Sequence, residues 1–196
     1  QVDTILVGDS LNMSFGGHSE TIGISVDEMI YHSCAVRRGA PRPYMIVDMP
    51  FGSCATPELA IKNCIKVYEK TGCDALKIEG GKEMADTIKK LTQNGIAVVP
   101  HIGLRPQTSR FYGGYKVNGR DDETAKILLE DALALQEAGG VMIVIEGTIS
   151  GVATKITKAL KIPTIGIGAG CDCDGQVLVW SDMLGFFDEF KPKFVK

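Results

Sequence analysis

The sequence lacks an excess of positive charge, since 21 Lys and Arg residues stand against 24 Asp and Glu residues and the formal net charge is -3. This balance gives no general affinity for polyanions, so nucleic acid is not expected as a partner. The sequence also lacks an apolar run of about 18 residues, the length that a membrane span needs, and a basic segment followed by an apolar signal core. We therefore expect a soluble, cytoplasmic protein.

Cysteine occurs six times, but neither in the C-x-x-C spacing of a zinc site nor at the density of a small secreted scaffold. The one close pair, Cys171 and Cys173, has no second pair with which to bind a soft metal. Free thiols are the expected state of all six.

What the sequence does contain is a repeated unit of a short apolar run followed by a helical segment. With 196 residues and 44% apolar composition, residues 1–196 are expected to form a single domain with a sizeable core. The expected strands are 4–7, 44–47, 75–78, 97–99, 141–145, 163–167 and 176–180. The expected helices are 26–38, 56–68, 83–91, 123–138 and 152–160.

Strands that are apolar without alternation indicate a parallel sheet covered by helices. Two α/β architectures fit this pattern, a doubly wound open sheet and a (β/α)8 TIM barrel, and the number of units favours the barrel. The first expected strand begins at Thr4, almost at residue 1. We therefore expect a TIM barrel that lacks its first strand-helix unit in this chain.

Five successive expected strands end in polar or ionisable residues, and barrel enzymes place their chemistry at these ends. An acid at a single strand end is most often a turn former or a helix cap, whereas several converging on one mouth favour a site. The residues in question are Asp9 and Ser10, Asp48, Lys77 and Glu79, His101, and Glu146.

Lys77 and Glu79 are two positions apart on one strand, so both side chains point to the same face. Charged groups on the inner face of a strand are seldom tolerated unless they are paired or bound to something. By themselves these two residues fit an internal ion pair and a catalytic rim equally well.

Three carboxylates in one mouth repel one another and are best accommodated around a cation. Asp9, Asp48 and Glu79 offer the oxygen ligands that a hard ion such as Mg²⁺ prefers. Lys77 could neutralise an anionic substrate or an enolate oxygen, and Glu146 is free to act as a base. His101 fits equally a hydrogen-bonding partner of the ligands and a catalytic group.

Two other segments are interpreted structurally. The segment 166–170 is rich in glycine but lacks the G-x-G-x-x-G spacing of a dinucleotide site. The segment 111–116 fits an ordinary exposed loop, with a glycine-hinged lid as the alternative.

Several segments together resemble ketopantoate hydroxymethyltransferase (3-methyl-2-oxobutanoate hydroxymethyltransferase), the family of the first committed step of pantothenate and coenzyme A synthesis. They follow the family order from one end of the chain to the other. The matching segments are 7–10, 31–32, 36–41, 48–51, 55–58, 77–81, 101–104, 113–117, 166–170 and 174–176.

This resemblance implies a barrel of the phosphoenolpyruvate/pyruvate-binding type, a Mg²⁺ ion, 5,10-methylenetetrahydrofolate as co-substrate and a homodecamer. It implies that Mg²⁺ is bound by Asp9 and Asp48 and completed by Glu79. The keto acid would contact Asp9, Ser10, Asp48 and Lys77, and Glu146 would be the proton acceptor. The implied reaction is hydroxymethyl transfer to 3-methyl-2-oxobutanoate, which gives 2-dehydropantoate.

The chain departs from the family pattern at the absent first unit and after Glu146, where residues 147–150 replace a turn that usually contains proline.

Two alternative functions remain. One is a Mg²⁺-dependent carbon-carbon lyase of the same superfamily, although its Lys-Lys-Cys-Gly-His stretch does not occur in this chain. The other is a binding protein without catalysis, against which the retained acids, Lys77 and Glu146 argue.

Overall fold

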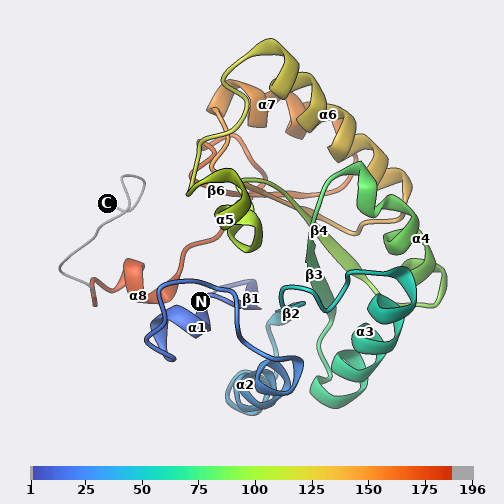
Figure 1. Cartoon of the computed structure of the whole chain (residues 1–196), viewed down its shortest axis with the longest axis vertical. Coiled ribbons are helices and arrows are strands. Elements are labelled where there is room, and N and C mark those ends of the chain that lie inside the picture. The colour runs from blue at the N-terminus through green and yellow to red at the C-terminus, as the bar shows by residue number, and fades with distance from the viewer. Residues whose placement is uncertain (1, 187–196) are drawn as a thin grey trace.

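The computed structural model describes residues 2–186, in which seven strands form one parallel sheet. The strands are β1 (Thr4–Val7), β2 (Tyr44–Asp48), β3 (Ala75–Glu79), β4 (Val98–Gly103), β5 (Ile143–Glu146), β6 (Thr164–Ile167) and β7 (Gly175–Gln176). They lie side by side in chain order, whereas the strand order of a doubly wound sheet reverses partway. The sheet curls with its helices on the outside, which confirms the predicted TIM-barrel architecture with one unit fewer than eight (Figure 1).

Five longer helices cover the outer face of the sheet, and shorter helical turns lie in the connections (Figure 1). The longer helices are α2 (Val26–Gly39), α3 (Pro57–Thr71), α4 (Ala85–Gln93), α6 (Asp122–Glu137) and α7 (Ser150–Ala159). The short turns are α1 (Leu11–Ser14), η1 (Lys82–Met84), η2 (Pro106–Thr108), α5 (Ser109–Tyr112) and α8 (Trp180–Met183). No helix within residues 2–186 combines the length and hydropathy that would carry it through a lipid bilayer.

Local sequence explains where the first long helices begin and end. The hydroxyl of Ser25 accepts a hydrogen bond from Glu28 N while the Glu28 carboxylate accepts one from Ser25 N, so a complete capping box starts α2. The hydroxyl of Thr56 caps α3 by accepting a hydrogen bond from Leu59 N, and Gly72 ends that helix in a left-handed conformation with φ +61°. These signals fix the helices before any tertiary contact is considered.

The strands carry two different kinds of residue on their inner face. Near the start of four neighbouring strands the inner face holds an apolar cluster of Ile46, Ala75, Val99 and Val144. Because side chains alternate along a strand, the residue two positions further along points the same way. Those four residues are Asp48, Lys77, His101 and Glu146. The interior is therefore apolar towards one end and ionisable at the carboxyl ends of the strands.

The prediction for the last strand is wrong in its extent. The sequence predicts a strand over 176–180, but β7 pairs with β6 only through Gly175 and Gln176. Trp180 instead begins the short helix α8, in which its carbonyl accepts a hydrogen bond from Leu184 N. An apolar run of this length does not by itself distinguish a strand from a turn of helix.

Gly103, at the end of β4, sits against the end of β5. Its φ is +89°, and a Cβ atom there would lie 2.2 Å from the carbonyl oxygen of Glu146 and 2.6 Å from Thr148 Oγ1. A side chain at this position would strain the backbone and push aside the strand end that carries Glu146.

We predict that Gly103→Ala lowers the free energy of unfolding by about 2 kcal/mol or more, because it adds a left-handed alanine and a backbone clash. Urea unfolding measures this change. Gly151→Ala in α7 is the control, since nothing lies within 4 Å of its added Cβ and alanine favours a helix. Equal stability of the two variants would contradict the prediction.

Candidate active site at the carboxyl ends of the strands

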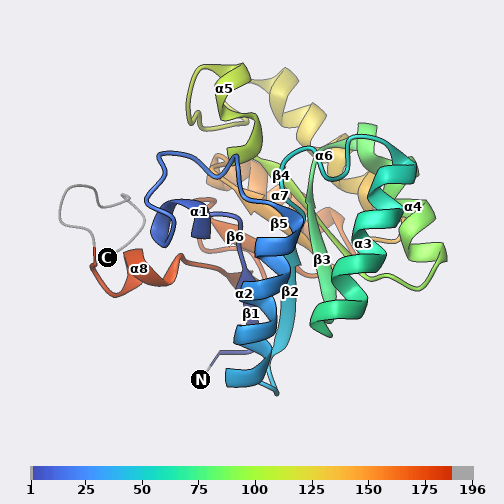
Figure 2. The same cartoon turned by 60° about the horizontal axis from the view of Figure 1, so that its bottom comes forward.

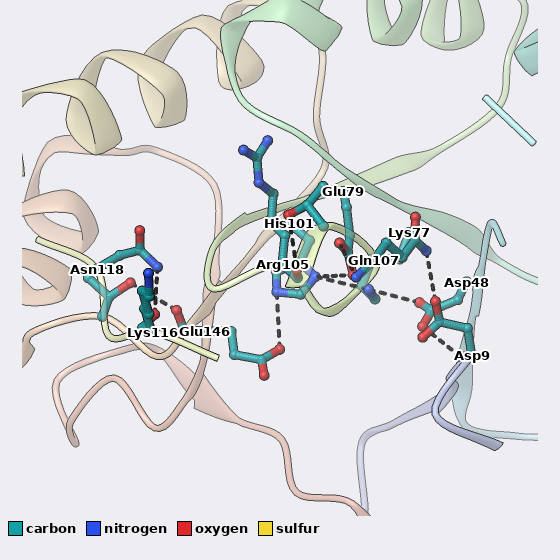
Figure 3. Close-up of polar contacts among 12 residues, drawn as sticks. Asp9, Asp48, Lys77, Glu79, His101, Arg105, Gln107, Lys116, Asn118 and Glu146 are labelled. Carbon is teal, nitrogen blue, oxygen red and sulfur yellow. Dashed lines mark hydrogen bonds and ion pairs between the residues drawn. The ribbon is translucent and has the colours of Figure 1, made fainter. Parts of the chain in front are cut away.

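A buried ion pair between Asp48 and Lys77 lies at the centre of the site (Figure 3). The strand register sets these residues opposite each other on β2 and β3, and Lys77 Nζ lies 3.1 Å from Asp48 Oδ1. Both side chains are almost completely buried, at 5% and 4% exposure. Burial alone would lower the pKa of Lys77, but the charges of Asp48, Glu79 and Asp9 more than offset it and raise the pKa. Lys77 is therefore a permanent buried cation.

His101 joins this ion pair to Glu146 (Figure 3). Its Nδ1 lies 3.1 Å from Lys77 Nζ, and because an ammonium group only donates, Nδ1 must accept. Burial and the neighbouring Lys77 charge lower the pKa of His101, so the ring is neutral and carries its proton on Nε2. Nε2 lies 3.2 Å from Glu146 Oε2. The histidine thus presents an N–H to the Glu146 carboxylate.

Asp9 and Glu79 bring two more acids into the same space. The backbone N–H of Asp9 donates to Asp48 Oδ2 at 2.9 Å, which places the two aspartates side by side. Burial, followed by the charge of Asp48, raises the pKa of Asp9 to about 7. Burial raises the pKa of Glu79 to about 8, although Lys77 acts in the opposite direction. Both acids are therefore harder to ionise in this site than in water.

Ser10 and Glu146 lie towards the rim of this cluster. Ser10 follows Asp9 directly and occupies the N-cap position of α1. A Cβ on Gly8 would lie 3.1 Å from Ser10 Oγ and 3.5 Å from Asp48 Oδ2, so the glycine leaves room for both groups. The Glu146 side chain is 24% exposed, against 2% for His101. Glu146 is thus more accessible from the mouth than His101 is.

Gln107, in η2 after β4, completes the cluster from a loop. Its amide Nε2 donates to Asp9 Oδ2 at 2.8 Å and to the carbonyl of Met49 at 3.0 Å. Its backbone N–H donates to Glu79 Oε2 at 3.2 Å. Sequence reasoning missed this residue, because a glutamine in a polar loop has no periodicity or strand end to reveal its position.

The loop that carries Gln107 lies over the mouth of the barrel, with α5 above the strand ends (Figure 2). Hydrogen bonds from Leu104 N to Glu146 O and from Asn118 N to Gly147 O, both 2.8 Å, anchor its two ends beside β5. Arg110 on α5 forms an ion pair with Glu20 of the loop after β1.

The same loop brings Tyr115 towards the acids and roofs a separate cavity. Burial and the Glu146 charge raise the pKa of the Tyr115 hydroxyl. A cavity of about 390 Å³ lies between the loop and α6, lined by residues that include Arg105, Lys116 and Asp131. Every residue of the segment 111–116 is exposed, as expected for an ordinary exposed loop.

The described residues suit a hard cation in their chemistry. Glu79 Oε1 is buried and has no hydrogen-bond partner among residues 2–186, and Asp9 and Asp48 are adjacent carboxylates. In the same part of the chain, no three His, Cys, Asp or Glu side chains are arranged to hold a metal ion by themselves. Mg²⁺ typically binds one or two carboxylates and completes its shell with water and substrate oxygens, so the two observations are compatible.

We predict that Asp9→Asn stabilises the protein at pH 8.5 when no divalent cation is added. The raised pKa means that the folded protein holds a proton which the unfolded chain releases near pH 3.8, so wild-type stability falls as the pH rises through about 7. The amide does not titrate, so its advantage should grow from little at pH 5 to roughly 1–3 kcal/mol at pH 8.5.

Thermal unfolding at the two pH values measures this advantage of Asp9→Asn, and the exposed Asp3→Asn serves as the control. An Asp9→Asn advantage that does not depend on pH would refute the electrostatic explanation.

Comparison with known proteins identifies the family. The sequence profile of ketopantoate hydroxymethyltransferase matches residues 1–196. The chain is 67% identical over 195 residues to 3-methyl-2-oxobutanoate hydroxymethyltransferase of Campylobacter fetus subsp. fetus (strain 82-40), of which it covers 74%. It is 58% identical over 195 residues to the enzyme of that name from Helicobacter pylori (strain P12), of which it covers 72%; both alignments span 100% of this chain.

A solved structure shows the same fold at low identity. The crystal structure of 2,3-dimethylmalate lyase, a PEP mutase/isocitrate lyase superfamily member, matches with a TM-score of 0.59 and 16% identity over 84% of this chain and 58% of the lyase. Identity this low supports the barrel fold alone, whereas the whole-chain matches decide the family. The chain belongs to the ketopantoate hydroxymethyltransferase family.

Proposed function

We propose that the protein transfers a hydroxymethyl group from 5,10-methylenetetrahydrofolate to 3-methyl-2-oxobutanoate and so forms 2-dehydropantoate, in the synthesis of pantothenate. Family membership over the whole chain supports this reaction. The observation that carries the mechanism is the neutral His101, which lies between a buried cation and an accessible carboxylate. Enolisation of a keto acid needs both, a base for the proton and a positive group for the oxygen.

Asp9, Asp48 and Glu79 would hold a Mg²⁺ ion, and the closeness of these buried carboxylates supports this assignment. When bound, the ion would draw electron density from the keto group and acidify the adjacent C3–H. Asp9, Ser10, Asp48 and Lys77 would contact the keto acid, because they surround the same space at the ends of β1, β2 and β3.

Glu146 would remove the C3 proton. His101 Nε2 lies 3.2 Å from one oxygen of the carboxylate, which leaves the other oxygen for the substrate. Lys77 would hold the enolate oxygen. Its ammonium has three N–H donors, and the hydrogen bond to His101 uses one of them. Because Lys77 is fixed before the substrate arrives, its charge needs no reorganisation during the reaction.

The enolate carbon would then bond to the methylene carbon of the folate as one of its two carbon-nitrogen bonds breaks and that nitrogen takes up a proton. Water would hydrolyse the second bond, its oxygen remaining on carbon as the hydroxyl group and its proton passing to the departing nitrogen. The loop with α5 and Tyr115 would cover the reacting groups, since it already crosses the mouth from β4 to the loop after β1. A homodecamer in the cytoplasm remains the prediction for assembly and location.

Exchange of the C3 proton tests the enolising half-reaction without folate. We expect ¹H NMR to show loss of the C3 proton of 3-methyl-2-oxobutanoate in deuterated water when the full-length protein and Mg²⁺ are both present. Omission of Mg²⁺ should abolish the loss. Absence of exchange in both conditions would contradict the proposed reaction and favour a binding protein.

We predict that Glu146→Gln slows this exchange by about 100-fold or more, the usual contribution of a positioned general base. Binding of Mg²⁺ and keto acid, measured by calorimetry, should remain, because the amide preserves shape and Glu146 is not among the proposed ligands. Glu137→Gln at the exposed end of α6 is the matched control. Near-normal exchange by Glu146→Gln would remove Glu146 from the role of base.

A further inference from the structure

Gln107 contacts the ends of three neighbouring strands at once (Figure 3). Its side chain donates to Asp9, which follows β1, and to the carbonyl of Met49, which follows β2. Its backbone donates to Glu79, the last residue of β3. These contacts bridge between 28 and 98 residues of sequence, so a single loop residue ties together strand ends that come from distant parts of the chain.

Two of these three acceptors are proposed metal ligands. Gln107 Nε2 donates to Asp9 Oδ2, so Gln107 does not hold the other oxygen of this carboxylate, Oδ1. The backbone N–H of Gln107 donates to Glu79 Oε2. Oε1 of the same carboxylate is buried and has no hydrogen-bond partner among residues 2–186. In each acid, therefore, Gln107 binds one oxygen and leaves the other one available.

We infer that Gln107 is a positioning residue for the divalent cation, which turns Asp9 and Glu79 so that one oxygen of each faces the metal. This inference rests on the proposed metal site. Hydrogen bonds to ligating carboxylates fix their orientation, and loss of such a bond typically costs about 10- to 100-fold in metal affinity. The inference also links the loop to the metal, because Gln107 reaches the acids only when η2 lies over the mouth.

Replacement of Gln107 by methionine tests the inference, because methionine has a similar length but cannot donate from its side chain. Mn²⁺ serves as the probe, since it accepts the same oxygen ligands as Mg²⁺. Electron paramagnetic resonance counts free Mn²⁺ in titrations of the full-length protein without keto acid. We expect the dissociation constant of Gln107→Met to rise about 10- to 100-fold over wild type. Gln93→Met, at the exposed end of α4, should leave it unchanged.

Two further measurements separate positioning from a general structural defect. The circular dichroism spectrum of Gln107→Met without metal should match that of wild type at the titration temperature, although the lost hydrogen bonds to Asp9 and to the Met49 carbonyl lower its thermal midpoint. Turnover lost at low Mg²⁺ concentration should return at saturating Mg²⁺, because the variant changes occupancy of the site and leaves Lys77 and Glu146 in place.

Unchanged or tighter Mn²⁺ binding by Gln107→Met would overturn the inference, and tighter binding would mean that Gln107 competes with the cation for Asp9. If wild type itself binds no Mn²⁺, the proposed metal site fails and the inference fails with it. The wild-type titration therefore tests the proposed function, and the difference between variant and wild type tests the role of Gln107.

Discussion

The ammonium group of Lys77 is the constraint on which the site depends. It is the charge that lets Asp48, Asp9 and Glu79 share a space from which water is largely excluded. Replacement of this lysine by a neutral residue would leave buried acids without compensation, which is far more costly than loss of an exposed ion pair. Even so, the balance is incomplete, since two of the acids have raised pKa values. These acids therefore hold protons near neutral pH, which the proposed cation would displace.

On the inner face of the strands, apolar and ionisable side chains occupy different positions along the strand, because every second residue points inward. The apolar cluster around Ile46 and Val99 fills the interior, and the ionisable residues follow two positions later on the same face. The outer face of β3 carries Leu76 and Ile78 into the apolar layer beneath the helices. One sheet thus provides a hydrophobic core on both faces and a polar site at one rim, which is how barrels combine stability with reactivity.

Strand ends and loops differ in how far the sequence predicts them. The residues at the strand ends could be predicted from the sequence. An apolar run that stops at an acid indicates where the strand ends and to which face of the sheet the acid points, as at Asp48 and Glu146. The place of Gln107 in the site could not be predicted from the sequence, because it depends on a contact with Asp9 across 98 residues of chain. The strand predicted at 176–180 was wrong because its pairing ends at Gln176 and the next residues turn into α8. The local sequence pattern determines helices and strands, whereas long-range contacts determine which loop side chains lie over the strand ends.

The register between β2 and β3, which sets Asp48 opposite Lys77, has a consequence for folding. If β3 slipped by one residue, Lys77 and Glu79 would turn into the apolar layer under the helices, and Leu76 and Ile78 would enter the polar mouth. Misaligned states would therefore carry two desolvated charges against hydrocarbon, a cost that no nearby group offsets. The charged side chains of β3 therefore also favour the native register of the sheet over a one-residue slip.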